Sequence, residues 1–447
     1  MLSMFRTSVA LVVFPAFAAA QSLAPAVFVA NNGNLRGSVT SLRINPDGTL
    51  ALVQDLVTAE VPSGQSSPGT NAYSISLSPD GAYLAVSHAT AASVTEQISL
   101  IRVNPDATLT FETAAQTPDS PLDVEWVSDS LLLATRTRTS GTNEIILYRV
   151  DRNPIRLTEV DREPAGSFAS RLAIGPQGLV FVNDSPLSGG GQLRVYRVDA
   201  LAHTLTPLGT MFTSTTYALG MGLTPDGTRV YTAGGASTPY RVSALTLDPI
   251  TGLLSEVPGN PFPSSGQSPK ECVASPDGAF LFVGHGTDAT IRTHAIAPDG
   301  ALSEVSIAFD VGIQSSLGDI ATLRVPGPTP QDLLLFTDKE TFDGTPRGIF
   351  SALINPDGSI QLRTVRLDTG AISPNDLAVW PGSSPACDPD VNQDGNTDQD
   401  DIAYLVNVIS GGGNPTGIDP DFNRDGNEDQ DDLLALVHTI AGGGCPE

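Results

Sequence analysis

A strand-turn-strand unit recurs along most of this chain, and the repeat constrains the fold more than any other feature. In each unit two apolar runs flank a turn, often a tight Pro-Asp-Gly turn and in the last unit a longer proline-rich one, which suits the reversal of an extended chain. These units span residues 73–88, 122–137, 171–184, 218–234, 271–286 and 319–338. A repeat of roughly 50 residues predicts a solenoid or a propeller.

A second set of turns alternates with the first. These turns lie at residues 45–48, 104–107, 151–154, 199–203, 248–252, 297–300 and 355–358. They give seven outer hairpins against six inner ones, and the seventh inner pair forms if strand 376–380 joins strand 26–30. We therefore predict a mainly β fold, a seven-bladed β-propeller whose first blade is completed by both ends and leaves no open sheet edge. Two packed β-sandwiches are the alternative, but they explain neither the alternation nor the complementary ends.

Two copies of a twelve-residue acidic pattern, 31 positions apart, lie near the end of the chain. Oxygen donors at alternating positions can wrap around a calcium ion, and a glycine at position six makes the sharp turn. The predicted ligands are Asp390, Asn392, Asp394, Asn396, Asp398 and Asp401 in the first copy, and Asp421, Asn423, Asp425, Asn427, Asp429 and Asp432 in the second. One copy alone could be a solvated turn, but duplication in one register favours two calcium ions.

An amphipathic helix is expected after each loop. The apolar positions are Ile402, Leu405, Val406 and Ile409 in the first helix, and Leu433, Leu436, Val437 and Ile440 in the second. Glycine triplets at 411–413 and 442–444 are expected to end the helices. Two loop-helix units without an entering helix do not make an EF-hand pair. The segment 387–447 instead resembles a dockerin, and the resemblance implies a small α-helical domain that binds two calcium ions and docks onto a cohesin-like protein.

The dockerin resemblance also implies which residues contact the partner. They are those at positions ten and eleven of each loop, here Gln399, Asp400, Gln430 and Asp431. The best-known dockerins carry hydroxyl pairs there, so the identity of the partner stays open. The ends of dockerin-like folds come together, which implies a disulfide between Cys387 and Cys445; two independent thiols are the alternative. The third cysteine, Cys272, is expected to be a small buried residue of a strand.

The first 20 residues have the features of a signal peptide: Arg6, an apolar stretch at 9–17 and a run of alanines at 18–20. A secreted or cell-surface protein is therefore expected. No segment approaches the ~20 apolar residues of a membrane span. The predicted organisation is a signal peptide at 1–20, a propeller at 21–381, a linker at 382–386 and the calcium-binding segment at 387–447.

The net charge of −26 is unevenly distributed. Residues 387–447 hold 14 acidic residues against one arginine, so half of the excess belongs to the predicted calcium ligands and their neighbours. The chain has only 23 lysines and arginines and none form a run. This balance argues against nucleic acid as a partner, because affinity for phosphates comes from basic patches.

The repeating body resembles the lactonase-type seven-bladed propellers, a group that includes one class of 6-phosphogluconolactonase. The resemblance rests on the recurring units and on Pro258-Gly-Asn-Pro-Phe262 followed by Ser268-Pro269. The enzymes carry a Gly-Pro-Arg-His segment and an Asn-Glu pair. The nearest matches here are Ser268-Pro-Lys270-Glu271 and Val182-Asn183-Asp184, which reproduce neither, so catalytic residues stay unassigned and the resemblance fixes a scaffold rather than a function.

Polar residues recur where the inner strands begin, at Asn71, Asp123, Glu125, Arg171, Lys270, Glu271, Asp319, Asn375 and Asp376. They are expected to face the channel, either as a ligand site or as a solvated lining with internal salt bridges. Asp123 and Glu125, beside Arg171, are the first candidates for an acid and base pair. His88 and His285, at the ends of second strands, are expected to be structural hydrogen bonders.

Three functions remain open on these grounds. In the first, an exported protein is anchored through the calcium-dependent segment to a cohesin-type partner or a cell-surface complex, and the propeller binds a small molecule or glycan or acts as a scaffold. In the second, the same segment delivers a lactonase or a carbohydrate-active hydrolase that works in polysaccharide breakdown. The third is a purely structural surface protein.

Overall fold

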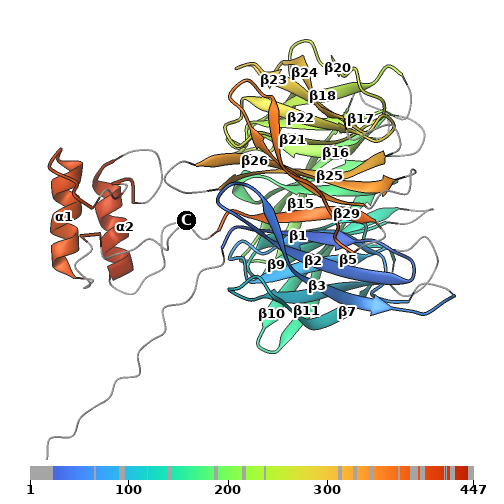
Figure 1. The fold of residues 1–447 in the computed structure, drawn as a ribbon, viewed down its shortest axis with the longest axis horizontal. Coiled ribbons are helices and arrows are strands. Elements are labelled where there is room, and N and C mark those ends of the chain that lie inside the picture. The colour runs from blue at the N-terminus through green and yellow to red at the C-terminus, as the bar shows by residue number, and fades with distance from the viewer. Residues whose placement is uncertain are drawn as a thin grey trace, which may run out of the picture.

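A computed structural model describes residues 24–64, 67–89, 96–117, 119–137, 142–185, 190–213, 218–235, 238–310, 315–325, 330–341, 347–370, 373–382, 391–392, 398–416, 418, 420–422 and 428–440. Within these residues the chain forms seven antiparallel sheets, two α-helices and one short 3-10 helix at Pro176–Gly178 (Figure 1). The sheets are the blades of a propeller. The prediction of a mainly β, seven-bladed fold is therefore confirmed.

Each blade runs from an innermost to an outermost strand. Blade 1 contains β29 (Pro374–Trp380), β1 (Ala26–Asn31), β2 (Arg36–Ile44) and β3 (Leu50–Glu60). Blade 2 contains β4 (Ala72–Leu77), β5 (Tyr83–His88), β6 (Glu96–Val103) and β7 (Leu109–Thr117). Blade 3 contains β8 (Val124–Ser128), β9 (Leu131–Arg136), β10 (Asn143–Arg152) and β11 (Ile155–Gly166). Blade 4 contains β12 (Ala169–Ile174), β13 (Leu179–Asp184), β14 (Gln192–Asp199) and β15 (Thr204–Phe212).

The remaining blades follow the same order. Blade 5 contains β16 (Ala218–Leu223), β17 (Arg229–Gly234), β18 (Arg241–Leu247) and β19 (Leu254–Glu256), with β20 (Phe262–Pro263) also paired to β18. Blade 6 contains β21 (Pro269–Ala274), β22 (Phe280–His285), β23 (Thr290–Ile296) and β24 (Leu302–Asp310). Blade 7 contains β25 (Ser315–Val325), β26 (Gln331–Thr341), β27 (Gly348–Ile354) and β28 (Ile360–Leu367).

The two ends of the propeller complete one blade, as the sequence predicts. Strand β29 pairs antiparallel with β1, with Ala26 opposite Trp380 and Ala30 opposite Asp376, and the two lie side by side in Figure 1. The innermost strands contact one another in the closed order β4, β8, β12, β16, β21, β25, β29 and back to β4. Closure leaves no blade at the end of the array, so no blade interface is left exposed.

The hydrophobic core lies between the blades. Seven clusters of buried side chains each join one blade to the next. Because side chains alternate along a strand, β1 serves two of them: Ala26 and Phe28 pack toward blade 2, whereas Val27 and Val29 pack toward blade 7. Cys272 is buried between blades 5 and 6, as predicted for a small strand residue.

The Pro-Asp-Gly turns are stabilised by their own side chains. In the turn before β5 the Ser78 hydroxyl donates to Asp80 at 2.6 Å, and the Gly81 N–H donates to the Ser78 carbonyl at 2.8 Å. Gly81 has a φ of +70°, which glycine adopts without strain. Ala107 adopts a φ of +66° at the matching place in the Asn-Pro-Asp-Ala turn.

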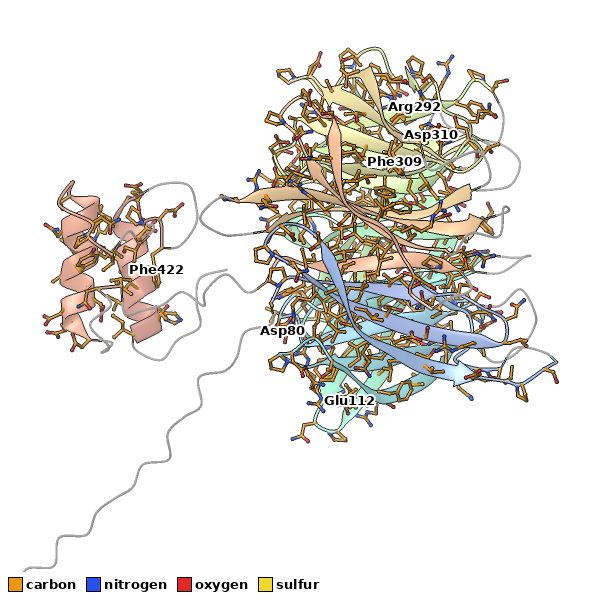
Figure 2. The ribbon with its side chains drawn as sticks, in the orientation of Figure 1. Asp80, Glu112, Arg292, Phe309, Asp310 and Phe422 are labelled. Atoms are coloured by element: carbon orange, nitrogen blue, oxygen red, sulfur yellow. The ribbon has the colours of Figure 1, made fainter. Side chains whose placement is uncertain are left out.

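The segment after the propeller contains α1 (Gln399–Ile409) and α2 (Gln430–Ile440). Their shared core is made of Val391, Leu405, Phe422 and Leu436, and Figure 2 labels Phe422 beside the helices. Both helices lie where the sequence predicts them, but Val406 and Val437 are each 42% exposed rather than buried. Each helix packs mainly on its neighbour, so the buried face is narrower than the predicted stripe. Among the described residues, no helix has the length and apolar character that crossing a membrane requires.

Candidate functional site

The innermost strands place one equivalent residue from each blade around the centre of the channel. In blades 1, 4, 5 and 6 these residues pair with one residue near the end of the second strand: Asp376 with Ala30, Arg171 with Asn183, Gly220 with Ala233 and Glu271 with Gly284. In blades 2, 3 and 7 their N–H groups donate to hydroxyls at the same place, those of Ser87, Thr135 and Thr337. The ring consists of Ser74, Asp123, Arg171, Gly220, Glu271, Asp319 and Asp376. It therefore carries four carboxyl groups and one guanidinium.

Arg171 reaches from blade 4 to all four of these carboxyl groups. Its Nη2 lies 2.6 Å from Asp319 and 3.2 Å from Glu271. Its Nη1 lies 3.2 Å from Asp376 and 3.8 Å from Asp123. Burial alone would lower the pKa of Arg171, but Glu271, Asp376, Asp319 and Asp123 raise it well above its ordinary value, so the arginine stays charged.

The ring has four carboxyl groups but one positive charge, and the pKa values of three of these carboxyl groups are raised. Burial, partly offset by Arg171, raises the pKa of Asp123 to about 7, that of Glu271 above its ordinary value, and that of Asp319 well above it. The neighbouring Asp376 and Glu271 add to this rise in the pKa of Asp319. The ring thus holds exchangeable protons near neutral pH, as acid–base sites do.

Two pockets meet at this ring, and Arg171 and Glu271 line both. One pocket, of about 260 Å³, is lined by residues that precede the ring by one position, including Tyr73, Ser170 and Asn375. The other, of about 390 Å³, is lined by residues two positions further along the strands, including Ser76 and Glu125. The pair Arg171–Glu271, 3.2 Å apart, is thus the boundary between the two halves of the channel.

The first of these pockets, here called the mouth pocket, gathers polar groups of several kinds. Lys270 enters from β21, and Lys339 enters from β26 with its Nζ 5.7 Å from the centroid of the Tyr73 ring. The Asn375 side-chain amide donates to the Tyr73 carbonyl at 2.6 Å, and its amide oxygen has no hydrogen-bond partner among the residues that the structure describes. Cationic groups at the rim and a carboxyl group at the floor suit an anionic or strongly polar ligand.

Asp123 and Glu125, the predicted acid and base, have different surroundings in the structure. Asp123 accepts from the Ser74 hydroxyl and from the Leu172 N–H, both at 2.5 Å, so it ties blades 2, 3 and 4 together. Glu125 lies in the second pocket, where the Ser76 hydroxyl donates to it at 2.8 Å. Burial and the neighbouring Asp123 raise the pKa of Glu125 from 4.5 to about 8. Neither lines the mouth pocket.

The remaining residues predicted to face the channel divide in a simple way. Arg171, Glu271, Asp319 and Asp376 come together in the ring, and Lys270 and Asn375 line the mouth pocket. Asn71 does neither: it is buried, with a φ of +55°, and its N–H donates to the Gly33 carbonyl. Sequence reasoning missed Tyr73 and Lys339. Lys339 lies near the end of a second strand, where the alternation of apolar and polar residues does not predict that a side chain faces the channel.

His88 and His285 are structural, as predicted. Nε2 of His88 lies 2.9 Å from the Ser99 hydroxyl, and Nε2 of His285 lies 2.9 Å from the Ser264 hydroxyl. Nδ1 of each bonds a backbone carbonyl, and both side chains are buried. Burial lowers the pKa of each to about 4. Both ring nitrogens of each histidine are thus engaged inside the protein, which indicates a brace rather than a catalytic base.

The nearest matches to the lactonase motifs fall into two groups. Lys270 and Glu271 reach the channel, as described above. Asn183 and Asp184 do not, because Asp184 is buried beneath Arg194, with 2.9 Å between Asp184 Oδ2 and Arg194 Nη2, and it accepts from the Ser167 N–H at 2.9 Å. Asn183 is buried and donates to the Gly220 carbonyl at 3.3 Å.

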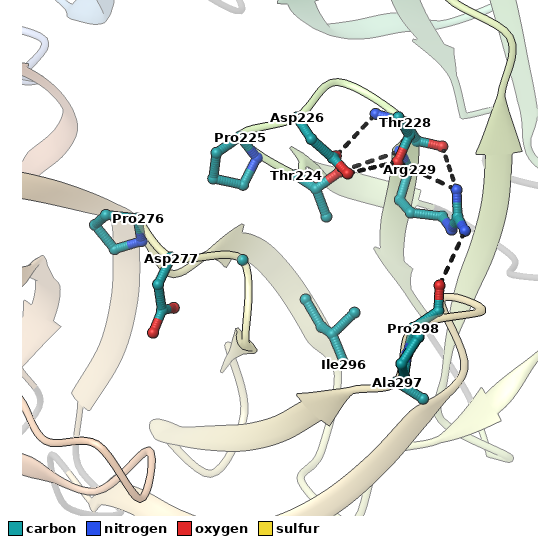
Figure 3. A pocket seen from close by; sticks show the side chains of 11 residues that line it. Thr224, Pro225, Asp226, Thr228, Arg229, Pro276, Asp277, Ile296, Ala297 and Pro298 are labelled. Atoms are coloured by element: carbon teal, nitrogen blue, oxygen red, sulfur yellow. Dashed lines mark hydrogen bonds between the residues drawn. The ribbon is translucent and has the colours of Figure 1, made fainter. Parts of the chain in front are cut away.

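A third pocket, of about 360 Å³, lies between the turns of blades 5 and 6 (Figure 3). Its charged groups are engaged locally. Asp226 accepts from Thr224 and Thr228 hydroxyls at 2.5 and 2.8 Å, and Arg229 donates to the Pro298 carbonyl at 3.3 Å. These bonds explain the shape of the turns and leave the channel as the stronger candidate site.

The predicted calcium ligands lie only partly within the described residues. Asp390, Asp394, Asn396, Asn423, Asp425 and Asn427 are outside them, as are Cys387, Cys445 and the predicted signal peptide. Within them, no three His, Cys, Asp or Glu side chains are grouped so as to hold a metal ion. Asp401 and Asp432, the last ligands of the two loops, are fully buried and accept at 2.8 Å from the N–H groups of Asp398 and Asp429.

The predicted partner-binding residues occupy the first turns of the two helices. Gln399 and Asp400 in α1, and Gln430 and Asp431 in α2, are all exposed. The Asp400 and Asp431 N–H groups each donate to the capping aspartate of their helix, Asp398 or Asp429, at 2.9 Å. The two copies thus have the same local geometry.

Comparison with known proteins identifies the scaffold. The family model described as "Lactonase, 7-bladed beta-propeller" matches residues 19–173 and 181–314, more than half of the chain. A comparison with curated proteins finds no match.

Solved structures share the fold at low sequence identity. A protein from Lactobacillus plantarum and a putative 6-phosphogluconolactonase from Bacteroides uniformis each have a TM-score of 0.61 and 15% identity, over 80% of this chain and 99% of theirs. A functionally unknown protein from Desulfotomaculum acetoxidans has a TM-score of 0.57 and 14% identity, over 80% of this chain and 98% of its own. The family match and the seven closed blades agree, and the chain belongs to the lactonase family of seven-bladed β-propellers.

A prediction about acidity follows from Glu125. Its pKa in the folded state exceeds the ordinary value, so its contribution to stability is fully present below about pH 4.5 and is lost as the pH rises through about 8. When the pH rises from 6.5 to 9, the free energy of unfolding of the wild type should fall. In Glu125→Gln this fall should be smaller by roughly 1–3 kcal/mol. Urea unfolding at both pH values measures this.

Two choices make that measurement specific to Glu125. Above pH 6.5 the buried histidines no longer contribute, because their lowered pKa affects stability only between about pH 4 and 6.5. Glu112→Gln, on the outer strand β7, removes a carboxylate far from the channel and should leave the pH dependence as in the wild type. An equal effect of both variants would contradict the assignment to Glu125.

Proposed function

We propose that the propeller hydrolyses lactones of polar, negatively charged sugar acids in the mouth pocket. The observation that supports this most is the convergence of Glu271, Arg171, Lys270 and Lys339 on one pocket of a lactonase-family propeller. The fold neighbour described as a putative 6-phosphogluconolactonase is consistent with such a substrate class.

In the proposed reaction Glu271 is the general base. Its carboxylate takes a proton from a water molecule, and the water oxygen forms a bond to the lactone carbonyl carbon. Lys270 and Lys339 bind the negatively charged group of the substrate, which holds the lactone carbonyl carbon beside Glu271. The ring C–O bond then breaks, the leaving oxygen receives the proton from Glu271, and the product is an open-chain hydroxy acid. The raised pKa of Glu271 suits proton transfer near neutral pH.

The lysines should decide which lactones react. Lys270→Met and Lys339→Met are each expected to lower kcat/KM about tenfold for a lactone with a phosphate or carboxylate group, which corresponds to ~1.4 kcal/mol. They should change kcat/KM much less for the matching neutral lactone. Steady-state kinetics on such a pair of substrates test this, and equal losses on both would contradict a charge-reading role.

We further propose that the segment with α1 and α2 binds two calcium ions and attaches the exported protein to a cohesin-like protein or a cell-surface assembly. The duplicated geometry favours this. Asp401 and Asp432 are buried carboxylates in equivalent positions, and buried negative charge is costly unless a cation or hydrogen bonds compensate it. Gln399, Asp400, Gln430 and Asp431 are exposed where a partner could reach them. Replacing these four residues should abolish docking and leave calcium affinity nearly unchanged.

A further inference from the structure

One nitrogen of Arg171 serves two carboxyl groups that differ in their access to the mouth pocket. Nη2 lies 2.6 Å from Asp319 and 3.2 Å from Glu271. Glu271 lines the mouth pocket, whereas Asp319 lines only the second pocket. The shorter contact therefore goes to the residue that the substrate does not meet.

The two carboxylates compete for this nitrogen. A guanidinium forms strong paired hydrogen bonds with a carboxylate only when its nitrogens are aimed at it. Asp319 draws Nη2 toward blade 7, and Asp376 and Asp123 take Nη1, so no pair of guanidinium nitrogens is aimed at Glu271.

We propose that Asp319 is a positioning residue for Glu271: by holding Nη2 of Arg171 it prevents the guanidinium from closing on Glu271, which leaves the Glu271 carboxylate available to accept a proton from water. The inference rests on the proposed function for its catalytic meaning. Its physical content, the control of Glu271 by Asp319 through Arg171, is independent of any substrate.

Several other charged groups lie near Glu271 and also affect its pKa. Lys270 on its own strand and Lys339 on β26 lower the pKa of Glu271, while Asp376 on β29 raises it. Asp376 is the largest of the like-charged contributors. If only the loss of a neighbouring negative charge mattered, removing Asp376 would lower the pKa of Glu271 at least as much as removing Asp319. If Asp319 acts by holding Arg171, removing Asp319 has the larger effect.

The test is a pH titration of the Glu271 carboxyl group in the full-length protein without substrate. Carbon-13 NMR of labelled glutamate follows it, and Glu271→Gln identifies the signal. In Asp319→Asn the guanidinium is released, so the titration midpoint of Glu271 should fall by about one pH unit. Asp319→Ser, which also removes the carboxyl group, repeats the test if the asparagine variant folds poorly.

Asp376→Asn is the matched control. It removes a like charge but leaves Asp319 on Nη2, so the midpoint should move clearly less than in Asp319→Asn. An unchanged midpoint in Asp319→Asn, or an equal or larger change in Asp376→Asn, would overturn the inference. In a working lactonase the acid limb of the kcat/KM profile should move with the midpoint. If the wild type hydrolyses no lactone, the proposed function fails, while the titration still decides the positioning role.

Discussion

Arg171→Gln is expected to destabilise the propeller by about 3–5 kcal/mol at pH 8, the typical cost of removing one partner from a buried ion pair. The variant leaves Glu271, Asp319, Asp376 and Asp123 facing one another without a positive charge. At pH 5 the loss should be smaller, because carboxyl groups with raised pKa values can then take up protons. Urea unfolding at both pH values measures the effect.

Arg324→Gln is the matched control for that loss. Arg324 pairs with Asp332 at 2.7 Å on the surface, and its side chain is 53% exposed. Exposed pairs contribute at most about 1 kcal/mol, and the effect should not depend on pH in this range. Equal losses in the two variants would show that the ring does not depend on Arg171 for its stability.

Calcium is expected to stabilise the helical segment and to leave the propeller unchanged. The four aspartates among the predicted ligands of each loop repel one another until a cation is bound, so binding and folding are coupled. At about one hundred times the dissociation constant, a calcium ion contributes roughly 2.7 kcal/mol per site. In the full-length protein, a thermal transition that loses helical signal should move to higher temperature with calcium and back with chelator.

Replacing Asp390, Asp394, Asp421 and Asp425 with alanine should abolish this shift and release the protein from its partner. The variant of Gln399, Asp400, Gln430 and Asp431 is the control, because these residues lie outside the predicted ligand set and should leave the calcium shift intact. A helical transition that ignores calcium in the wild type would contradict two calcium sites. Undiminished attachment of both variants would contradict docking through this segment.

The propeller could be predicted from the sequence because its determinants are local. Alternating apolar residues and Pro-Asp-Gly turns define each hairpin, and counting inner against outer hairpins shows that β1 and β29 must pair. Blade 5 departs from the pattern. Its outer strand is split into β19 and β20, and between them the Asn260 side chain accepts from the Ala244 N–H at 2.7 Å in place of a strand.

The contacts of the candidate site could not be predicted in the same way. Arg171 meets Glu271, Asp319 and Asp376 across sequence separations of 100, 148 and 205 residues. The sequence indicated that these residues face the channel, but which carboxyl groups share a nitrogen depends on how seven strands converge. Side-chain length also matters: Asp123 accepts a neighbouring backbone N–H, whereas Glu125, two residues later, extends into the second pocket.

The most direct test of the proposed active site is lactone hydrolysis by the full-length protein and by Glu271→Gln, measured on phosphorylated and unphosphorylated sugar lactones. The proposal predicts hydrolysis by the wild type and a loss in kcat of about 10²–10⁴ in the variant, as expected for removal of a general base. The variant should unfold at the same or a higher temperature, because it removes one of the crowded carboxylates around Arg171. No hydrolysis by the wild type, or an unchanged kcat in Glu271→Gln, would contradict an active site at the channel mouth.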